Sequence, residues 1–519
     1  MNRWSRIRKY GLYGGLIVLL LVPMAWLSQP ATSKSAGGKL ATLRADYKLS
    51  QANLGEIDPA SATMRLASLG MANVGANLLW SRANHYKKVE DWTNFRATLD
   101  QIIKLQPNFV AVWRFQAWNL SYNVSAEFDD YKDRYHWVKE GIKYLYRGNE
   151  FNADSPRLQW DTGWFISHKI GRSDERKQFR RMFRHDEDLF GEDAKTNEYD
   201  NWLEGKRWFE RAHDTVRRIN SYKGMNPLIF HADPAMAQIN SSDNLNEDGV
   251  YGERAKQSWQ KSHDDWTRYG DTILPTTFGF DIALNDQEPM EKKAKELRAK
   301  LDELAPGARE QIREEKRAAL KPEERAALDV PYEQRSPDQQ QLAGPVEDKV
   351  LVSHLEVAQR APEAKRLEAL NVADELARAE EYAHGVERYR SVVNFNYWRT
   401  RCEMERTDDA IAAHELVHSG KEKRAKGHLQ EAKEDFRAGL ARWKVVMAKF
   451  PELLDDRTTG EELAGVIEEY RTTLELLDES FPEDKFFQDV LNRYGKQAAM
   501  AREEVPDEPA EPAAAEPAK

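Results

Sequence analysis

The chain has 519 residues, of which 32% are charged and 40% hydrophobic, and its mean hydropathy is −0.77. This charge content suits long amphipathic helices with solvated faces and argues against a compact β protein. The formal net charge of −10 disfavours general nucleic-acid binding. The single cysteine, Cys402, excludes an intrachain disulfide, and we expect it to pack on a helix face.

The N-terminus combines a basic segment at 1–9 with an apolar segment centred on GLIVLLLVPMAWL at 15–27. This length lies between a signal-peptide core and a full membrane span. No clean A-x-A cleavage site follows, which favours an uncleaved transmembrane signal anchor at 10–28 over a cleaved signal. Under the positive-inside rule, residues 1–9 stay in the cytoplasm. The rest of the chain would then lie outside the inner membrane, in the periplasm.

A small, polar and sparsely periodic stretch at 29–65 is interpreted as a tether. Helical periodicity begins at about residue 66 and predicts three helices with proline between the second and third, since Pro107 cannot continue a hydrogen-bond ladder. The expected core stripes are Leu79, Ala83 and Tyr86; Phe95, Leu99 and Ile102; and Trp113, Ala117 and Leu120.

The distance from Leu79 to Trp113 is the period of a helix–turn–helix repeat, 34 residues. Ala83, Tyr86 and Pro107 also match the residue pattern of the tetratricopeptide (TPR) family, which this segment therefore resembles. Phe95 and Ile102 depart from that pattern, in which alanine is preferred. The resemblance implies stacked helix pairs, which we expect over 66–220.

A second unit is expected between Trp113 and Trp160, with extra residues near 125–136. Within it, Gly141, Leu145 and Gly148 provide small residues where two helices would touch. Pro156 opens a third unit, because proline is tolerated in the first turn of a helix. The second helix of that unit is not clear from the sequence.

The remainder of the chain divides by composition. Asn-Pro, Asp-Pro and Asp-Gly pairs predict a loop-rich connecting region at 221–285, with a helix around Trp259 and Trp266 and a short strand or extended arm after it. A charged helical region follows at 286–400, then a C-terminal helical region with a TPR-like pair at 401–498. The acidic Pro/Ala-rich tail at 499–519 is predicted to be disordered.

The stretch HELVH at 414–418 has the H-E-x-x-H spelling of a zinc-peptidase helix, with His414 and His418 as metal ligands and Glu415 acting on the bound water. No third ligand follows at a recognisable spacing. The flanking glycines and Ala432, Phe436 and Gly439 instead follow TPR spacing, which places HELVH in the first helix of a pair. If Leu416 faces the core, both histidines face solvent or the groove of the repeat.

Other catalytic motifs, such as G-x-S-x-G, G-x-x-x-x-G-K-[ST] and G-x-G-x-x-G, are absent from the sequence. The aromatic residues of the repeat region are expected mainly to pack helix on helix, with some lining a groove for a partner. The candidates for that groove are Trp80, Tyr86, Trp113, Trp118, Trp160 and Trp164.

These observations predict an all-α protein, built of TPR-like α-solenoid helix pairs and long charged helices behind one N-terminal transmembrane helix. The expected function is that of an inner-membrane-anchored scaffold without a cofactor, binding other envelope proteins or peptides through its repeats. One alternative is a zinc metallopeptidase using the HELVH helix. Another is an envelope element that contacts glycans through exposed aromatics.

Overall fold

The computed structural model describes residues 72–89 and 91–503, together with isolated positions between 11 and 42. The predicted anchor at 10–28 and tether at 29–65 therefore lie outside the described residues except at those positions. The prediction of a disordered tail at 499–519 is wrong for its first residues, because the last helix continues to Glu503, and residues 504–519 lie outside the described part. Among the described residues, no helix combines the length and apolar character that crossing a membrane requires.

The described chain is all-α, as predicted, and contains no strand. It divides into two compact units. Unit 1 comprises residues up to Asn226 and Met236–Ser241, and unit 2 comprises Pro227–Ala235 and residues from Ser242 onward. Helix α12 contributes residues to both units.

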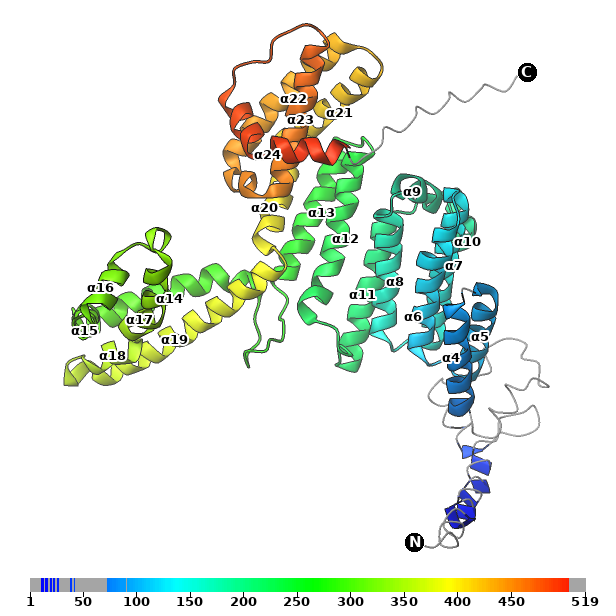
Figure 1. The fold of residues 1–519 in the computed structure, drawn as a ribbon, viewed down its shortest axis with the longest axis horizontal. Coiled ribbons are helices and arrows are strands. Elements are labelled where there is room, and N and C mark those ends of the chain that lie inside the picture. Colours follow the sequence, from blue (N-terminus) through cyan, green and yellow to red (C-terminus); the bar gives the residue numbers. More distant parts are fainter. Residues whose placement is uncertain are drawn as a thin grey trace. The chain divides into compact units, whose positions relative to one another are not determined.

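Unit 1 consists of antiparallel helix pairs, with α4 packed on α5, α6 on α7, and α8 on α11 (Figure 1). The helices are α4 (Ala72–Lys88), α5 (Trp92–Leu105), α6 (Val110–Trp118), η2 (Asn119–Val124), η3 (Ser125–Glu127), α7 (Tyr131–Phe151), α8 (Pro156–Trp164), η4 (Phe165–Lys169), α9 (Arg176–Arg184), α10 (Glu187–Phe190), η5 (Gly191–Lys195) and α11 (Asn201–Ile219).

Two of the three predicted core stripes in the first pairs are confirmed, whereas the stripe in α4 is fully buried only at Ala83, because Leu79 and Tyr86 are half-buried. Phe95, Leu99 and Ile102 are buried in α5, which ends before Pro107, and Trp113 and Ala117 are buried in α6. Pro156 occupies the first turn of α8, where the side chain of Ser155 caps the helix by accepting a hydrogen bond from the Leu158 N–H.

The partner of α8 is α11, which the sequence did not single out. The short helices α9, α10 and η5 lie between the two as an insertion that packs on α7. Phe179 and Phe183 are buried there, and the Phe179 ring lies 5.6 Å from that of Tyr135. The Tyr135 hydroxyl also donates a hydrogen bond of 2.9 Å to Asp186.

The same close contact occurs in two successive pairs of unit 1. A Cβ added to Gly141 of α7 would lie 2.2 Å from the Ser121 Oγ, and one added to Gly205 of α11 would lie 1.9 Å from the Ser167 Oγ. Both serines are fully buried and lie in π-helical segments, η2 and η4. They are 46 residues apart. The two pairs are thus built alike, despite the insertion in the second.

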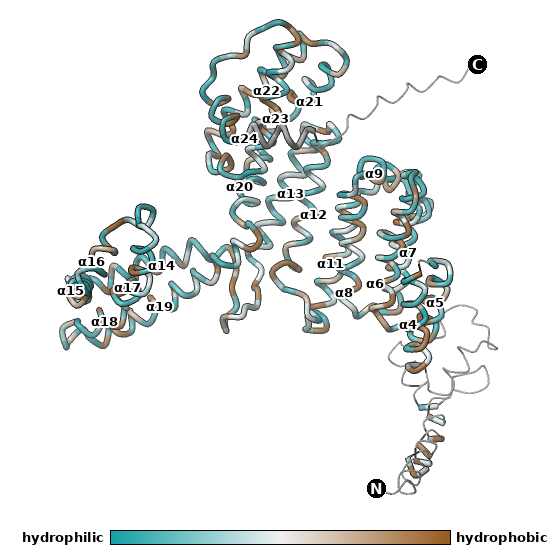
Figure 2. The backbone as a smooth tube through the Cα atoms, in the orientation of Figure 1, coloured by the Kyte–Doolittle hydropathy of each residue, from teal (hydrophilic) through white to brown (hydrophobic). Residues whose placement is uncertain are grey.

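Unit 2 contains a long helix pair, a group of short helices and a set of medium-length helices that includes the C-terminal pair. Helices α14 and α19 form a long pair around Ala294, Leu301 and Leu376, and hydrophilic residues predominate along both (Figure 2). Short helices cover its end. The helices are α12 (Pro227–Glu247), α13 (Glu253–Gly270), η6 (Leu284–Asp286), α14 (Gln287–Leu304), α15 (Ala308–Ala318), α16 (Pro322–Asp329), η7 (Tyr332–Gln334), α17 (Pro337–Val350), α18 (His354–Gln359), α19 (Glu363–Val392), α20 (Phe395–Glu405), α21 (Asp408–Ala425), α22 (Leu429–Lys449), η8 (Pro451–Asp455), α23 (Arg457–Glu475) and α24 (Lys485–Glu503).

The description of 221–285 as loop-rich is wrong, because α12 and α13 occupy most of it. Pro227 stands in the first turn of α12, where its missing N–H costs nothing, and Pro234 is accommodated inside the helix. Burial of apolar side chains along α12 outweighs the local turn preferences. The extended arm after α13 is present, but its pairing is a single isolated bridge between Leu274 and Ile282.

The C-terminal pair α21–α22 turns at Gly427, which has a φ of +82°, as its place between the two helices predicted. Ala432, Phe436 and Gly439 line α22 as expected. The predicted register of α21 was wrong by one residue: Val417 enters the core, and Leu416 is only half-buried.

Candidate functional site

Two arrangements in the described residues have the chemistry of a functional site, one in each unit. The first is a surface strip of aromatic side chains in unit 1. Its members come from the first helix of each successive pair and are partly exposed. We call the following five residues the aromatic strip: Trp80, Phe115, Trp118, Tyr122 and Trp164.

The rings of the strip follow one another across three helices. The Trp80 ring of α4 lies 5.7 Å from that of Phe115 in α6, which lies 6.2 Å from Trp118. Trp118 stacks on Tyr122 of η2 at 6.2 Å. The buried Phe165 connects Tyr122 to Trp164, at 5.8 Å from each ring. Such spacings are those of interacting aromatic pairs.

Two lysines lie over this strip. The Lys87 ammonium is 4.9 Å from the centre of the Phe115 ring and 5.7 Å from that of Trp118, and Lys169 is 4.4 Å from that of Tyr122. Neither lysine forms a hydrogen bond or an ion pair with any described residue. An ammonium over an aromatic face that forms no ion pair is suited to receive an anion from a ligand.

The strip contains some of the predicted groove residues and excludes others. Trp80, Trp118 and Trp164 belong to it, with Trp118 the most open at 40% exposure. Trp113 is fully buried against Gly148 and stacks on Phe151, so it cannot line a surface.

Two further groove candidates, Tyr86 and Trp160, are half-buried but do not join the strip. The Tyr86 ring contacts His85, and the Trp160 ring contacts Phe209 on the paired helix. Phe115, Tyr122 and both lysines were not predicted from the sequence. The π-helical turns η2 and η4 place Tyr122 and Lys169, and such turns are frequent at functional sites, but no residue pattern signals them.

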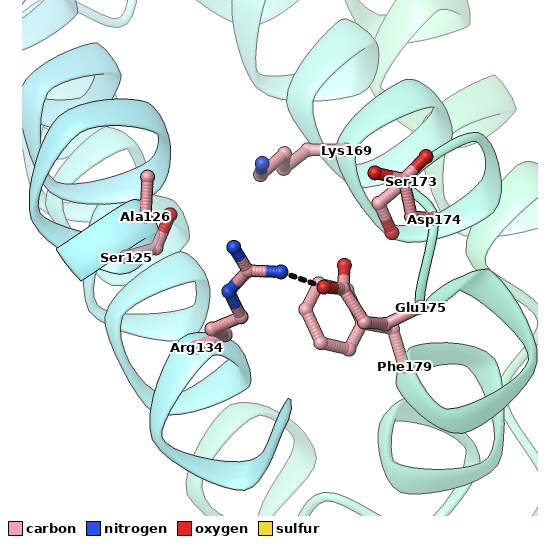
Figure 3. A pocket seen from close by; sticks show the side chains of 8 residues that line it. All are labelled: Ser125, Ala126, Arg134, Lys169, Ser173, Asp174, Glu175 and Phe179. Atoms are coloured by element: carbon pink, nitrogen blue, oxygen red, sulfur yellow. Dashed lines mark hydrogen bonds and ion pairs between the residues drawn. The ribbon is translucent and has the colours of Figure 1, made fainter. Parts of the chain in front are cut away.

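Lys169, whose ammonium lies over the strip residue Tyr122, also lines a pocket of about 170 Å³ (Figure 3). Arg134 of α7 and Lys169 both extend into it, and the dashed line marks the ion pair that Arg134 forms with Glu175. Arg134 also donates to the Phe128 carbonyl oxygen at 2.9 Å, whereas Lys169 has no such partner. Burial and the nearby Arg134 charge lower the pKa of Lys169, against the opposing effect of Asp174.

The second arrangement is a cluster of charged side chains in unit 2, around the HELVH helix. His414 Nε2 lies 2.8 Å from Oε2 of the buried Glu405, and Arg401 Nε lies 3.8 Å from its other oxygen. Arg401 also donates a 3.0 Å hydrogen bond to Asp243. Glu462 lies 4.0 Å from Arg401. The charges thus connect α12, α20, α21 and α23.

The electrostatics of this charge cluster follow from its geometry. Burial opposes ionisation of Glu405 and His414, but each is held charged by the other: the pKa of Glu405 lies below its ordinary value and that of His414 above it. Burial, together with Glu405 and Glu462, raises the pKa of Asp243 to about 6 despite the Arg401 charge. Burial likewise raises the pKa of the adjacent Cys402 thiol, which packs in the interior as predicted.

This arrangement does not fit a zinc site. His414 is bound to Glu405 and packs edge-on against Trp443, while His418 packs against Tyr251 and the backbone of Gly249. The two imidazole rings therefore contact different residues and do not share a position where one metal ion could bind. Glu415 is exposed. Within the described part of the chain, no group of three or more potential ligands is placed to hold a metal ion.

No family model and no curated protein matches this chain.

Proposed function

We propose that this protein is a membrane-tethered helical-repeat scaffold of the cell envelope, and that it binds a segment of another protein along the aromatic strip. The membrane attachment would be the apolar segment at 10–28 behind the basic residues 1–9, which we interpret as a signal anchor, and the stretch at 29–65 would be the tether. The binding part is unit 1, in which the first helices of successive pairs present their aromatic rings.

The observation that carries this proposal is the run of partly exposed rings across α4, α6 and η2, which the buried Phe165 connects to Trp164 of α8. Isolated exposed aromatics are ordinary on protein surfaces, but contiguous ones mark interaction sites. Recurrence of the Ser–Gly contact at 121 and 167 supports a repeat architecture of the TPR kind. Helical repeats bind extended or helical segments of partners on such faces.

Crosslinking in the native membrane tests this proposal. Full-length protein is crosslinked in the cells that produce it, and the adducts of the wild type are compared with those of Trp80→Ala and Trp118→Ala. A matched control is Trp137→Ala in α7, whose ring stacks on Phe128 away from the strip. We expect a defined set of protein adducts that both strip variants lose and the control keeps.

Two results would contradict the proposal. One is a set of adducts that is unchanged in the strip variants. The other is binding to cell-wall glycan fragments without any protein adduct, which would favour a glycan-contacting role for the same rings.

A further inference from the structure

The pocket beside the aromatic strip is lined by two cations and two anions, and one of the cations, Lys169, forms no ion pair with a described residue. Arg134 and Lys169 enter it from different helices, and Arg134 is already paired with Glu175. Lys169 is half-buried and has no hydrogen-bond or ion-pair partner among the described residues. A half-buried ammonium beside a second cation is electrostatically unfavourable, and a bound anion would relieve it.

The hydroxyls of the pocket add to this pattern. The Ser173 Oγ is buried and has no hydrogen-bond partner in the described structure. After rotation of its side chain toward the pocket it could donate to an anion that Lys169 attracts, which would relieve the cost of a buried hydroxyl without a partner. The remaining charged lining residue, Asp174, is exposed, so solvent screens its charge more effectively than that of Lys169.

Lys169 also joins the pocket to the strip. Its ammonium lies over the Tyr122 ring while the same side chain lines the pocket. A polypeptide lying on the strip would therefore bring its own side chains to the pocket mouth. With about 170 Å³, the pocket is large enough for one carboxylate side chain.

We propose that this pocket binds an aspartate or glutamate side chain of the partner segment, with Lys169 as the principal contact and Ser173 as a hydrogen-bond donor. The partner is thus an acidic segment whose neighbouring apolar residues cover the aromatic strip. The inference rests on the proposed function for the identity of the partner, but carboxylate binding in the pocket is separately measurable.

The reactivity of Lys169 provides the measurement. Full-length protein is treated with limiting acetic anhydride, and acetylation of each lysine is quantified by mass spectrometry. The probe is N-acetyl-glutamate methylamide, and its glutamine analogue is the neutral control. We expect the acidic probe to slow acetylation of Lys169, by several-fold at saturation, and the neutral one to leave it unchanged. Lys104, exposed on α5, serves as the internal reference.

Two variants should change the affinity for an acidic peptide in opposite directions. Lys169→Met should weaken binding of a labelled acidic peptide about tenfold, because it removes a charge-assisted contact. Asp174→Asn should strengthen that binding by about twofold, because it removes a repelling carboxylate whose charge solvent partly screens. A mere change in folding would not produce opposite effects from two substitutions five residues apart. Equal effects of the acidic and neutral probes on Lys169, or weaker binding by Asp174→Asn, would overturn the proposal.

A peptide arm separates this inference from the proposed function. A glutamate flanked by prolines and leucines should protect Lys169 at lower concentration than the single-residue probe, and Trp118→Ala should abolish that advantage. Equal potency of peptide and single residue would leave carboxylate binding in place but overturn the acidic-segment assignment along the strip. If neither probe protects Lys169, the proposal that the pocket binds a carboxylate is overturned. The crosslinking experiment would still test the proposed scaffold function.

Discussion

The contact between Gly141 and Ser121 predicts a large local cost for a small substitution. In Gly141→Ala the new Cβ would lie 2.2 Å from the Ser121 Oγ and 2.8 Å from the Ala117 carbonyl oxygen. The hydroxyl can rotate away, but the carbonyl belongs to the facing helix and moves only with it. Overpacking of this kind costs about 1–3 kcal/mol.

Hydrogen exchange measures this cost where it arises, because a chain with two compact units need not unfold in one step. A loss of about 2 kcal/mol would speed exchange of the most protected α7 amides roughly thirtyfold. Gly205→Ala should have a similar effect on α11, since its Cβ would meet the Ser167 Oγ at 1.9 Å and the Gly163 carbonyl oxygen at 2.8 Å.

The control is Gly344→Ala, where nothing lies within 4 Å of the added Cβ within helix α17. It should leave the exchange of α17 unchanged or slower, because alanine favours a helix by up to about 1 kcal/mol over glycine. Unchanged exchange of α7 in Gly141→Ala would refute the close packing on which the repeat architecture depends.

Three further predictions concern the charge cluster of unit 2. Because the pKa of His414 and that of Asp243 are raised in the folded state, their contributions to stability are lost as pH rises, whereas that of Glu405, whose pKa is lowered, is lost as pH falls. Asp243 loses its contribution between about pH 4 and its folded pKa of about 6, and His414 loses its contribution above pH 6.5. Urea unfolding should therefore show unit 2 losing stability as the pH rises from about 5 to 8, and His414→Gln should remove most of the decline above pH 6.5; a flat profile in the wild type would contradict this. Arg401→Met should destabilise unit 2 by about 3–5 kcal/mol in the same assay, since it leaves buried Glu405 and Asp243 with one cation fewer, and a loss below 1 kcal/mol would show that the cluster is solvated. Metal analysis of the purified full-length protein should find zinc well below one equivalent, because His414 is bound to Glu405; one equivalent that is lost in His414→Ala would revive the peptidase hypothesis.

Sequence periodicity predicted the parts of the fold that local spacing controls. The stripe of Phe95, Leu99 and Ile102 is buried as expected, since an amphipathic helix must bury its apolar face. The turn at Gly427 followed from a residue that tolerates positive φ.

Tertiary packing decided the features that the sequence did not predict. In α21, Leu416 and Val417 are both apolar, and the choice between them depends on which face meets Gly439 of α22; a Cβ on Gly439 would lie 3.0 Å from Val417. The partner of α8 was missed because an insertion of short helices separates α8 from α11 in the sequence. Pro234 suggested a loop because the cost of a proline inside a helix can be recognised from the local sequence. The burial of apolar side chains along α12, which offsets that cost, depends on tertiary packing and cannot be recognised in this way.

The candidate site was only partly predictable for the same reason. Trp80 and Trp118 were expected at a groove, and both lie in the strip. Phe115 and Lys169 were not, because an aromatic residue or a lysine in a helix has no distinctive pattern until its neighbours are known. Trp113 was expected there as well, but the adjacent Gly148 gives it a buried place.

Site-specific photocrosslinking tests the central claim most directly. A photoreactive phenylalanine analogue replaces Trp118 or, as a control, Trp137 in the full-length protein, and irradiation is carried out in the native membrane. The account predicts adducts at position 118 that map to an acidic segment of a partner protein, and few or none at 137. No adduct at 118, or the same adducts at both positions, would contradict it.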